Sequence, residues 1–333
     1  ETLRFRPPTP AWSARRPVLR RRLRRALESG DTEPTVAEVN EVGTSVVAHW
    51  YADEVATLGE RLGAAARAVV LSAMADEATR SASAPAGLAG AMAQAWHETM
   101  PLRLAPAMAR WRLFAGDVAG AGVILEHASQ PAGFAHAQLA LFAGDGRTAS
   151  RGFAKAVRDA GKAATTLDVD AYFLPLAYVA DGGPLRLKQA AEYIRVRAAT
   201  AGPIYAGWRS LAPLIDDTLP APDLHPRPLA ALLGALSAWW RGEQPDTDAI
   251  ERAASQADDL GWTGISEQLR LGPVAKGLVR LRDVRPEWLR SLEAATELVG
   301  AAPGGAAPTA HDRRIAWFLT ENHGEVDLRA REQ

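Results

Sequence analysis

The chain is 333 residues long and 47% hydrophobic, which is enough for a sizeable core and argues against wholesale disorder. Its formal net charge is −1, so the chain as a whole is neither a polybasic arm nor an acidic tail. It contains no cysteine, which excludes disulfides, thiolate nucleophiles and zinc–thiolate sites. No apolar run approaches the roughly 18 residues of a membrane span. We therefore expect no membrane partner and a cytoplasmic location.

The basic residues are unevenly chosen and unevenly placed. Only four of the 38 are lysine, which together with abundant Ala, Gly and Pro is typical of a high-GC bacterium. Residues 1–30 hold nine arginines against two glutamates, a net charge of +7, so the remainder of the chain carries −8. The first residue is Glu1, and we expect the chain to be one piece of a larger bacterial protein.

The N-terminal region changes character near residue 13. Three prolines within residues 1–12 predict an extended lead-in. A helix is expected from residue 13 to a stop at Gly30, with Pro17 in its first turn. Its apolar face, at helical spacing, consists of Val18, Leu19, Leu23, Ala26 and Leu27.

Two longer helical patterns follow this segment. One extends from Thr35 to Trp50, and the next from Val55 towards Met74. The small, polar and proline-broken segment Ser81–Gly87 predicts a loop.

A five-residue sequence occurs twice, 28 residues apart. Leu113-Phe114-Ala115-Gly116-Asp117 is repeated without change as Leu141-Phe142-Ala143-Gly144-Asp145. Such a sequence predicts a helical hairpin, in which Gly ends one helix in a left-handed conformation and Asp caps the next. Looser helix ends are expected at Ala180-Asp181-Gly182 and Trp240-Arg241-Gly242.

These patterns together predict an all-α fold with a short β-hairpin at its end. Residues 13–299 are expected to form an irregular helical-hairpin array of tetratricopeptide type. Residues 300–310, rich in Gly, Ala and Pro, predict a linker. Residues 311–333 change to a strand-like pattern around Glu321-Asn322-His323-Gly324, which predicts a β-hairpin.

Residue sets that could carry chemistry are incomplete. The nearest histidines, His127 and His136, have no acidic residues that complete a metal site. Gly161-Lys162 lacks both the earlier Gly and the following Ser or Thr of a phosphate-binding loop, and Gly43-Thr44-Ser45-Val46-Val47 fails as a nucleophile elbow. The acid pairs Asp216-Asp217 and Asp258-Asp259 are explained by helix capping. We expect no catalytic site and no cofactor.

The arginine-rich first helix is the candidate binding surface. Helical spacing sets Arg21 and Arg25 opposite the leucine stripe. Such a face could neutralise several phosphates and bind nucleic acid in a salt-dependent way. It could equally be a solvated face, or pair with acids between Glu28 and Glu41. The candidate nucleic-acid-binding residues are Arg16, Arg20, Arg21, Arg24 and Arg25.

The ten tryptophans predict core positions more than a stacking platform. Trp50 and Trp111 belong to apolar-periodic runs, as do three others. Trp12 and Trp262 lie outside such runs and are the exposed candidates.

The order of these features resembles the helical region that precedes the motor in large bacterial Swi/Snf-family helicase-like proteins. Three stretches of sequence carry the resemblance, which covers most of the chain. They are Arg16-Pro17-Val18-Leu19 with the Gly30-Asp31 stop; Gly152-Phe153-Ala154-Lys155-Ala156-Val157-Arg158 with Phe173-Leu174-Pro175-Leu176-Ala177-Tyr178; and Arg314-Ile315-Ala316-Trp317 with Arg329-Ala330-Arg331-Glu332-Gln333.

The resemblance implies a non-catalytic accessory module of a DNA-dependent ATPase, with the motor domain of its own polypeptide and duplex DNA as partners. The chain has no phosphate-binding loop and no acidic helicase motif, so no ATPase residue is transferred to it. The alternative is a tetratricopeptide-like protein–protein interaction scaffold of a bacterial regulator. The sequence does not predict an oligomeric state.

Overall fold

A computed structural model describes residues 10–30, 34–128, 133–160, 173–181, 226–240 and 243–272, together with Gln189 and Leu224. Within these ranges the regular structure is helical and contains no strand, which confirms the all-α prediction for this part of the chain. The expected linker 300–310 and β-hairpin 311–333 lie outside the described residues.

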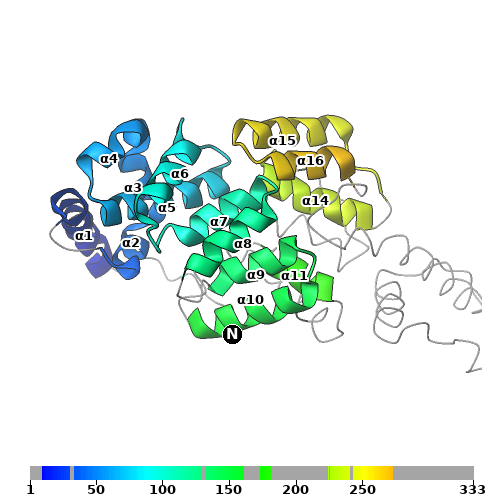
Figure 1. Cartoon of the computed structure of the whole chain (residues 1–333), viewed down its shortest axis with the longest axis horizontal. Coiled ribbons are helices and arrows are strands. Elements are labelled where there is room, and N and C mark those ends of the chain that lie inside the picture. The colour runs from blue at the N-terminus through cyan, green and yellow to red at the C-terminus, as the bar shows by residue number, and fades with distance from the viewer. Residues whose placement is uncertain are drawn as a thin grey trace, which may run out of the picture. The chain divides into compact units, whose positions relative to one another are not determined.

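From α2 to α8, from α9 to α10 and from α15 to α16 the helices follow one another through short connections, as Figure 1 shows. The chain divides into two compact units: unit 1 comprises Glu1–Met108 with His127–Ser129, and unit 2 comprises the remainder. The elements are α1 (Pro10–Ser29), α2 (Val36–Val42), α3 (Thr44–Trp50), η1 (Ala52–Thr57), α4 (Leu58–Arg61), α5 (Ala64–Ser81), α6 (Leu88–Thr99), α7 (Ala105–Phe114), α8 (Val118–His127), α9 (Gly133–Phe142), α10 (Gly146–Ala160), α11 (Leu174–Asp181), α14 (Pro228–Trp240), α15 (Thr247–Asp259) and α16 (Thr263–Leu271).

Several helix boundaries differ from the sequence prediction. Helix α1 begins at Pro10, inside the expected lead-in, because a proline in the first turn has no N–H that the helix needs. Pro17 is consequently an interior residue of α1 rather than a first-turn residue. The helix expected from Thr35 to Trp50 is divided at Gly43, whose φ of +100° is unfavourable for other residues. The expected ends at Asp181 and Trp240 are confirmed.

Helix α5 forms the centre of unit 1. Six consecutive residues, Ala66–Leu71, are buried, so α5 is covered on all sides rather than along one stripe. Helices α3 and α6 both pack against it. Arg67 lies within this buried run, and its guanidinium forms a 2.7 Å ion pair with Glu98 of α6. A buried cation held in this way ties α6 to α5, since breaking such a pair leaves a charge unpaired.

The repeated five-residue sequence forms the same turn twice in unit 2. Gly116 and Gly144 have φ values of +86° and +88°, as the sequence predicted. The two N–H groups at each turn bond back to the preceding helix, from Gly116 to Leu113 at 3.0 Å and from Asp117 to Arg112 at 2.8 Å. The second turn repeats both bonds from Gly144 and Asp145, at 3.0 and 2.9 Å. The predicted left-handed glycine turn between two helices is thus confirmed at both copies.

Both aspartates also cap the helix that follows, as predicted. The Asp117 carboxylate accepts a 2.8 Å hydrogen bond from the N–H of Gly120, and that of Asp145 accepts one of 2.9 Å from Thr148. The same type of turn recurs between α15 and α16, where Gly261 has a φ of +73°. There the backbone N–H of Trp262 donates a 2.8 Å hydrogen bond to the carbonyl of Ala257.

Aromatic side chains fill the space behind these turns. The ring of Phe114 lies 6.0 Å from that of Phe142 and 5.0 Å from that of Trp262, measured between centroids. Trp111 and Phe173 complete the cluster. Trp262 is fully buried, so the expectation that it is exposed was wrong. Its partners lie about 150 positions earlier in the chain, which a local pattern does not reveal.

The backbone of helix α16 at Gly264 packs directly against the backbone of the α7–α8 turn at Gly116. A Cβ placed on Gly264 would lie 2.5 Å from the backbone nitrogen of Gly116 and 2.6 Å from its Cα. The hydroxyl of Thr263 donates a 3.0 Å hydrogen bond to the carbonyl of Ala115 beside this contact. Only glycine at position 264 permits this separation.

Replacing Gly264 with alanine is expected to destabilise the protein by about 1–3 kcal/mol, because rigid backbone must move away from the new methyl group. Urea unfolding followed by tryptophan fluorescence measures the change. Gly90→Ala is the matched control: this exposed glycine in α6 has open space around its Cβ. The control is expected to gain about 0.5–1 kcal/mol. Equal effects of the two substitutions would refute the close approach of α16.

The Asp117 cap predicts a pH dependence of stability. The hydrogen bond from Gly120, reinforced by the Arg112 guanidinium 2.8 Å away, holds the pKa of Asp117 below its ordinary value. The stabilisation is therefore complete above the unfolded pKa of about 3.9 and disappears as the pH falls through the lower native pKa.

Asp117→Asn keeps a capping oxygen but removes the charge. At pH 7 it is expected to cost less than about 1 kcal/mol, because the side chain is partly exposed. Urea titrations at pH 7, 5, 4 and 3 are expected to show the gap between wild type and variant closing only in the most acidic samples. A gap that stays constant with pH contradicts the assignment.

Candidate interaction surfaces

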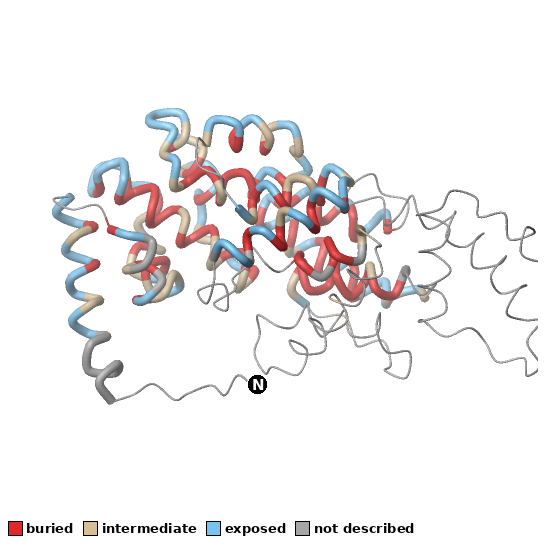
Figure 2. Tube along the Cα trace, turned by 90° about the horizontal axis from the view of Figure 1, so that it is seen from below, coloured by how far each residue is buried: buried red, intermediate tan, exposed pale blue. Residues whose placement is uncertain are grey.

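Helix α1 packs on unit 1 through its leucines and exposes arginines. Leu23 and Leu27 are buried as predicted, but Val18, the first residue of the predicted apolar face, is 58% exposed. Arg21 and Arg25, four residues apart, are exposed. Much of the described part of α1 is solvent-exposed in Figure 2. Neither arginine forms an ion pair with any residue that the structure describes, so both guanidinium groups are available to a partner.

Two neighbouring arginines of α1 are already engaged by acids of the same chain. Arg24 forms a 2.9 Å ion pair with Glu28, and this hydrogen bond raises the pKa of Arg24. Its guanidinium also lies 6.0 Å from the ring centroid of Trp50, within range of a cation–π contact. Arg22 pairs with Glu38 at 3.1 Å. The sequence alternative, pairing with acids between Glu28 and Glu41, therefore holds for these two arginines.

The remaining candidates differ in their surroundings. Arg20 is half-buried, and its Nε is enclosed without a hydrogen-bond partner in the described part of the chain. The side chain of Arg16 lies outside the described residues. Of the five predicted site residues, the structure thus presents Arg21 and Arg25 openly, engages Arg24 and partly encloses Arg20.

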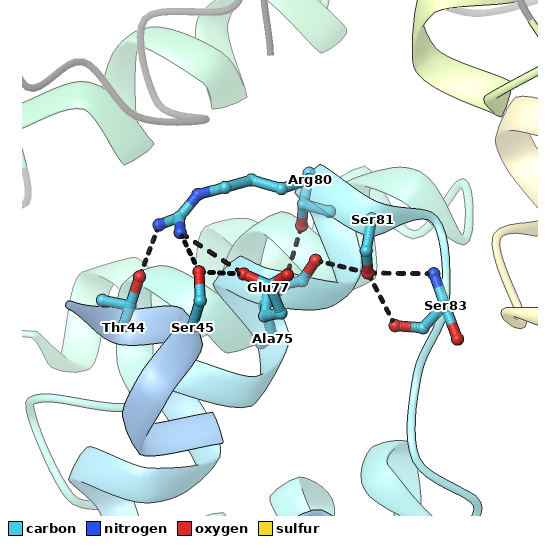
Figure 3. A network of polar contacts seen from close by, with 8 residues as sticks. Thr44, Ser45, Ala75, Glu77, Arg80, Ser81 and Ser83 are labelled. Carbon is cyan, nitrogen blue, oxygen red and sulfur yellow. Dashed lines mark hydrogen bonds and ion pairs between the residues drawn. The ribbon is translucent and has the colours of Figure 1, made fainter. Parts of the chain in front are cut away.

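A polar network joins α3 to the end of α5, as Figure 3 shows. The Ser45 hydroxyl donates a 2.5 Å hydrogen bond to the Glu77 carboxylate. Arg80 donates to the hydroxyls of Thr44 at 2.6 Å and Ser45 at 3.2 Å, and forms a 3.4 Å ion pair with Glu77. One turn on, the Ser81 hydroxyl donates to the Glu77 carbonyl at 2.8 Å. These bonds fix the Glu77 carboxylate in one position.

A pocket of about 810 Å³ opens beside this network. Its walls come from α3, η1, α5 and the loop that follows α5, and small apolar residues predominate. Its polar residues include two carboxylates, Asp53 and Glu77, together with three serines and His49. The lining residues are Ser45, Ala48, His49, Ala52, Asp53, Val55, Ala56, Met74, Glu77, Ser81, Ser83, Ala84, Pro85 and Ala86.

Sequence reasoning missed this pocket, although one signal was present. Alanine recurs at every fourth position as Ala48, Ala52 and Ala56. On one continuous helix this spacing would place small side chains along one line, but Ala48 lies in α3 and the other two lie in η1. The helix boundaries needed to use that signal were not available from the pattern alone.

Two groups with catalytic potential, Ser45 and Asp258, are engaged in polar contacts of the fold. Ser45 donates to the Glu77 carboxylate, which Arg80 also binds. Asp258 accepts a hydrogen bond from Ser266 and pairs with Arg270 at 2.6 Å, which together hold its pKa below the ordinary value. No group of three or more potential metal ligands occurs among the described residues. Gly161-Lys162 and Asp216-Asp217 lie outside them.

No family model matches the chain, and no match was found among curated proteins or solved structures. The resemblance to Swi/Snf-associated helical regions therefore rests on the quoted motifs alone. Across the described ranges, no helix is long and apolar enough to cross a membrane.

Proposed function

We propose that this chain is a non-catalytic helical interaction module that contacts DNA phosphates through the exposed face of α1. The observation that supports this most directly is the pair Arg21 and Arg25, which project from one helix face and form no ion pair with the described part of the chain. Two guanidinium groups one helical turn apart can contact neighbouring phosphates of a duplex. Such contacts give affinity without reading sequence.

The wider setting of this proposal is an accessory arm of a larger bacterial Swi/Snf-type DNA-dependent ATPase. In that setting the module would contact either the motor or the DNA beside it. The capped helical hairpins of unit 2 supply a rigid body suited to that role. The proposal leaves ATP hydrolysis to the motor.

A protein-binding scaffold of tetratricopeptide type is the second candidate. The engagement of Arg22 and Arg24 by Glu38 and Glu28 favours it, because these pairs reduce the net positive charge of α1. The repeated hairpin turn also favours it, since stacked helical hairpins commonly bind protein segments. This candidate predicts no affinity for DNA.

Binding to a fluorescent DNA duplex across a salt series separates the two candidates. Wild type is expected to bind at low salt and to lose affinity linearly in log–log form as salt rises. Arg21→Ser with Arg25→Ser is expected to weaken binding and to reduce the slope by about 2, since each phosphate contact contributes about 0.9. No binding by wild type, even at low salt, would favour the protein scaffold.

The control variant removes the same number of positive charges from a different helix. Arg147 and Arg151 of α10 are also exposed and also four residues apart. Replacing both with serine is expected to leave affinity and slope unchanged, because the proposal assigns contacts to α1. Equal losses from the two double variants would show a general charge effect and contradict an α1 site.

Neutralising the acids that pair with α1 arginines is expected to strengthen DNA binding, the opposite of removing the arginines. Glu28 and Glu38 compete with phosphate for Arg24 and Arg22. Glu28→Gln with Glu38→Gln is therefore expected to tighten DNA binding and to increase the salt slope by up to about 2. An unchanged affinity in this variant, with wild type binding normally, would mean that Arg22 and Arg24 do not reach the DNA.

A further inference from the structure

The pocket of unit 1 owes its space to short side chains and to the turn that follows α5. Its lining includes Ala48, Ala52 and Ala56 of α3 and η1 and Ala84, Pro85 and Ala86 of the loop after α5. Its volume of about 810 Å³ lies within the usual range of small-molecule sites, about 300–1,000 Å³. Such sites combine apolar side chains with polar groups that orient the ligand, and both are present in this lining.

The loop wall is held in an unfavourable backbone conformation. Ala82 ends α5 with a φ of +55°, a left-handed conformation that costs a residue with a Cβ about 1–2 kcal/mol. This turn directs Ser83–Ala86 back over the pocket. The Ser81 hydroxyl accepts a 3.3 Å hydrogen bond from the Ser83 N–H, and the Ser83 carbonyl, 3.1 Å away, shares the hydroxyl proton with the nearer Glu77 carbonyl. The wall is therefore bonded in place.

Two carboxylates, Asp53 and Glu77, lie in the lining, and His49 is its one basic residue. Ser45 and Arg80 bind the Oε2 atom of Glu77, so this carboxylate is oriented before any ligand arrives, although the Arg80 guanidinium offsets part of its charge. Asp53 is exposed and forms no ion pair within the described ranges. A cation entering the pocket would meet the unpaired Asp53 carboxylate and a Glu77 carboxylate that it shares with Arg80.

We propose that this pocket binds a small organic cation, an amine with an apolar body. The body would lie against the alanines, Val55 and Met74, and the ammonium group would donate hydrogen bonds to Asp53 and Glu77. The amine fits because apolar residues form much of the lining and its two carboxylates, Asp53 and Glu77, share only one cation, Arg80. A neutral or anionic ligand of the same shape lacks this complementarity. The site is independent of the α1 face, so either proposal can fail alone.

The methionines provide a direct test on the full chain. The protein has four, and Met74 is the one that lines the pocket, so methyl-labelled methionine gives one reporter and three internal controls. The probe is 2-phenylethylamine, compared with the neutral 2-phenylethanol and the anionic 3-phenylpropanoate. We expect the amine to shift the Met74 resonance saturably, with a Kd on the order of millimolar for so small a ligand. The alcohol and the carboxylate are expected to bind at least about fivefold more weakly.

Substitutions then test whether the Asp53 and Glu77 carboxylates bind the amine. Asp53→Asn with Glu77→Gln removes both charges while keeping similar shapes, and is expected to weaken amine binding about fivefold or more. Glu60→Gln is the matched control, an exposed glutamate of α4 outside the lining, and is expected to leave binding unchanged. Ala56→Phe fills the pocket and is expected to abolish binding.

Three results would overturn the proposal. The first is that the Met74 resonance does not respond saturably to the amine. The second is equal affinity for the amine, the alcohol and the carboxylate, which would show an apolar pocket without charge selection. The third is unchanged amine binding in Asp53→Asn with Glu77→Gln while that variant keeps the wild-type spectrum of Met92, Met100 and Met108.

Discussion

The left-handed turn at Gly116 is the constraint on which much of unit 2 depends. It ends α7, aligns Asp117 to cap α8, and exposes a flat stretch of backbone against which Gly264 lies. Phe114, two residues earlier, carries the aromatic contacts to Phe142 and Trp262. A side chain at Gly264 would push α16 away from the turn, and one at Gly116 would strain the turn because its φ is +86°. Either change would disturb the contacts of the aromatic rings. Backbone conformation and core packing are therefore not independent here.

Charge is used differently in the two units. In unit 2, Arg270 bonds Asp258 of the preceding helix, and its own burial is slight, so this pairing adds modestly to the packing of α15 and α16. In unit 1, Arg67 is buried within α5, and its pair with Glu98 is a requirement for burying the charge at all. Arg21 and Arg25 of α1 belong to neither class, because they are exposed and form no ion pair with the described residues, while Leu23 and Leu27 of the same helix are buried. This arrangement is the basis for proposing an anionic partner at α1.

Features whose requirements are local could be predicted from the sequence. The turn at Gly144 needs only a glycine after an apolar helix and an aspartate after the glycine, and all of these are adjacent in the chain. The burial of Trp262 could not be predicted, since it requires Phe114 and Trp111 to arrive from far earlier positions. The candidate site divides in the same way: helical spacing predicts the exposed Arg21 and Arg25, whereas the pocket requires knowing how α3 and α5 pack and where Ala82 turns the chain.

Helix α3 relates the two surfaces proposed for unit 1. One of its ends carries Trp50, which lies near the Arg24 guanidinium, and its other turns carry Ser45 and His49, which line the pocket. A seven-residue helix packed on α5 moves as one piece rather than residue by residue. If an amine in the pocket alters DNA binding at α1, DNA must alter amine binding by the same factor, because coupling free energies are reciprocal. Measuring the Kd for 2-phenylethylamine with and without duplex DNA therefore tests whether α3 connects the two sites or merely supports both.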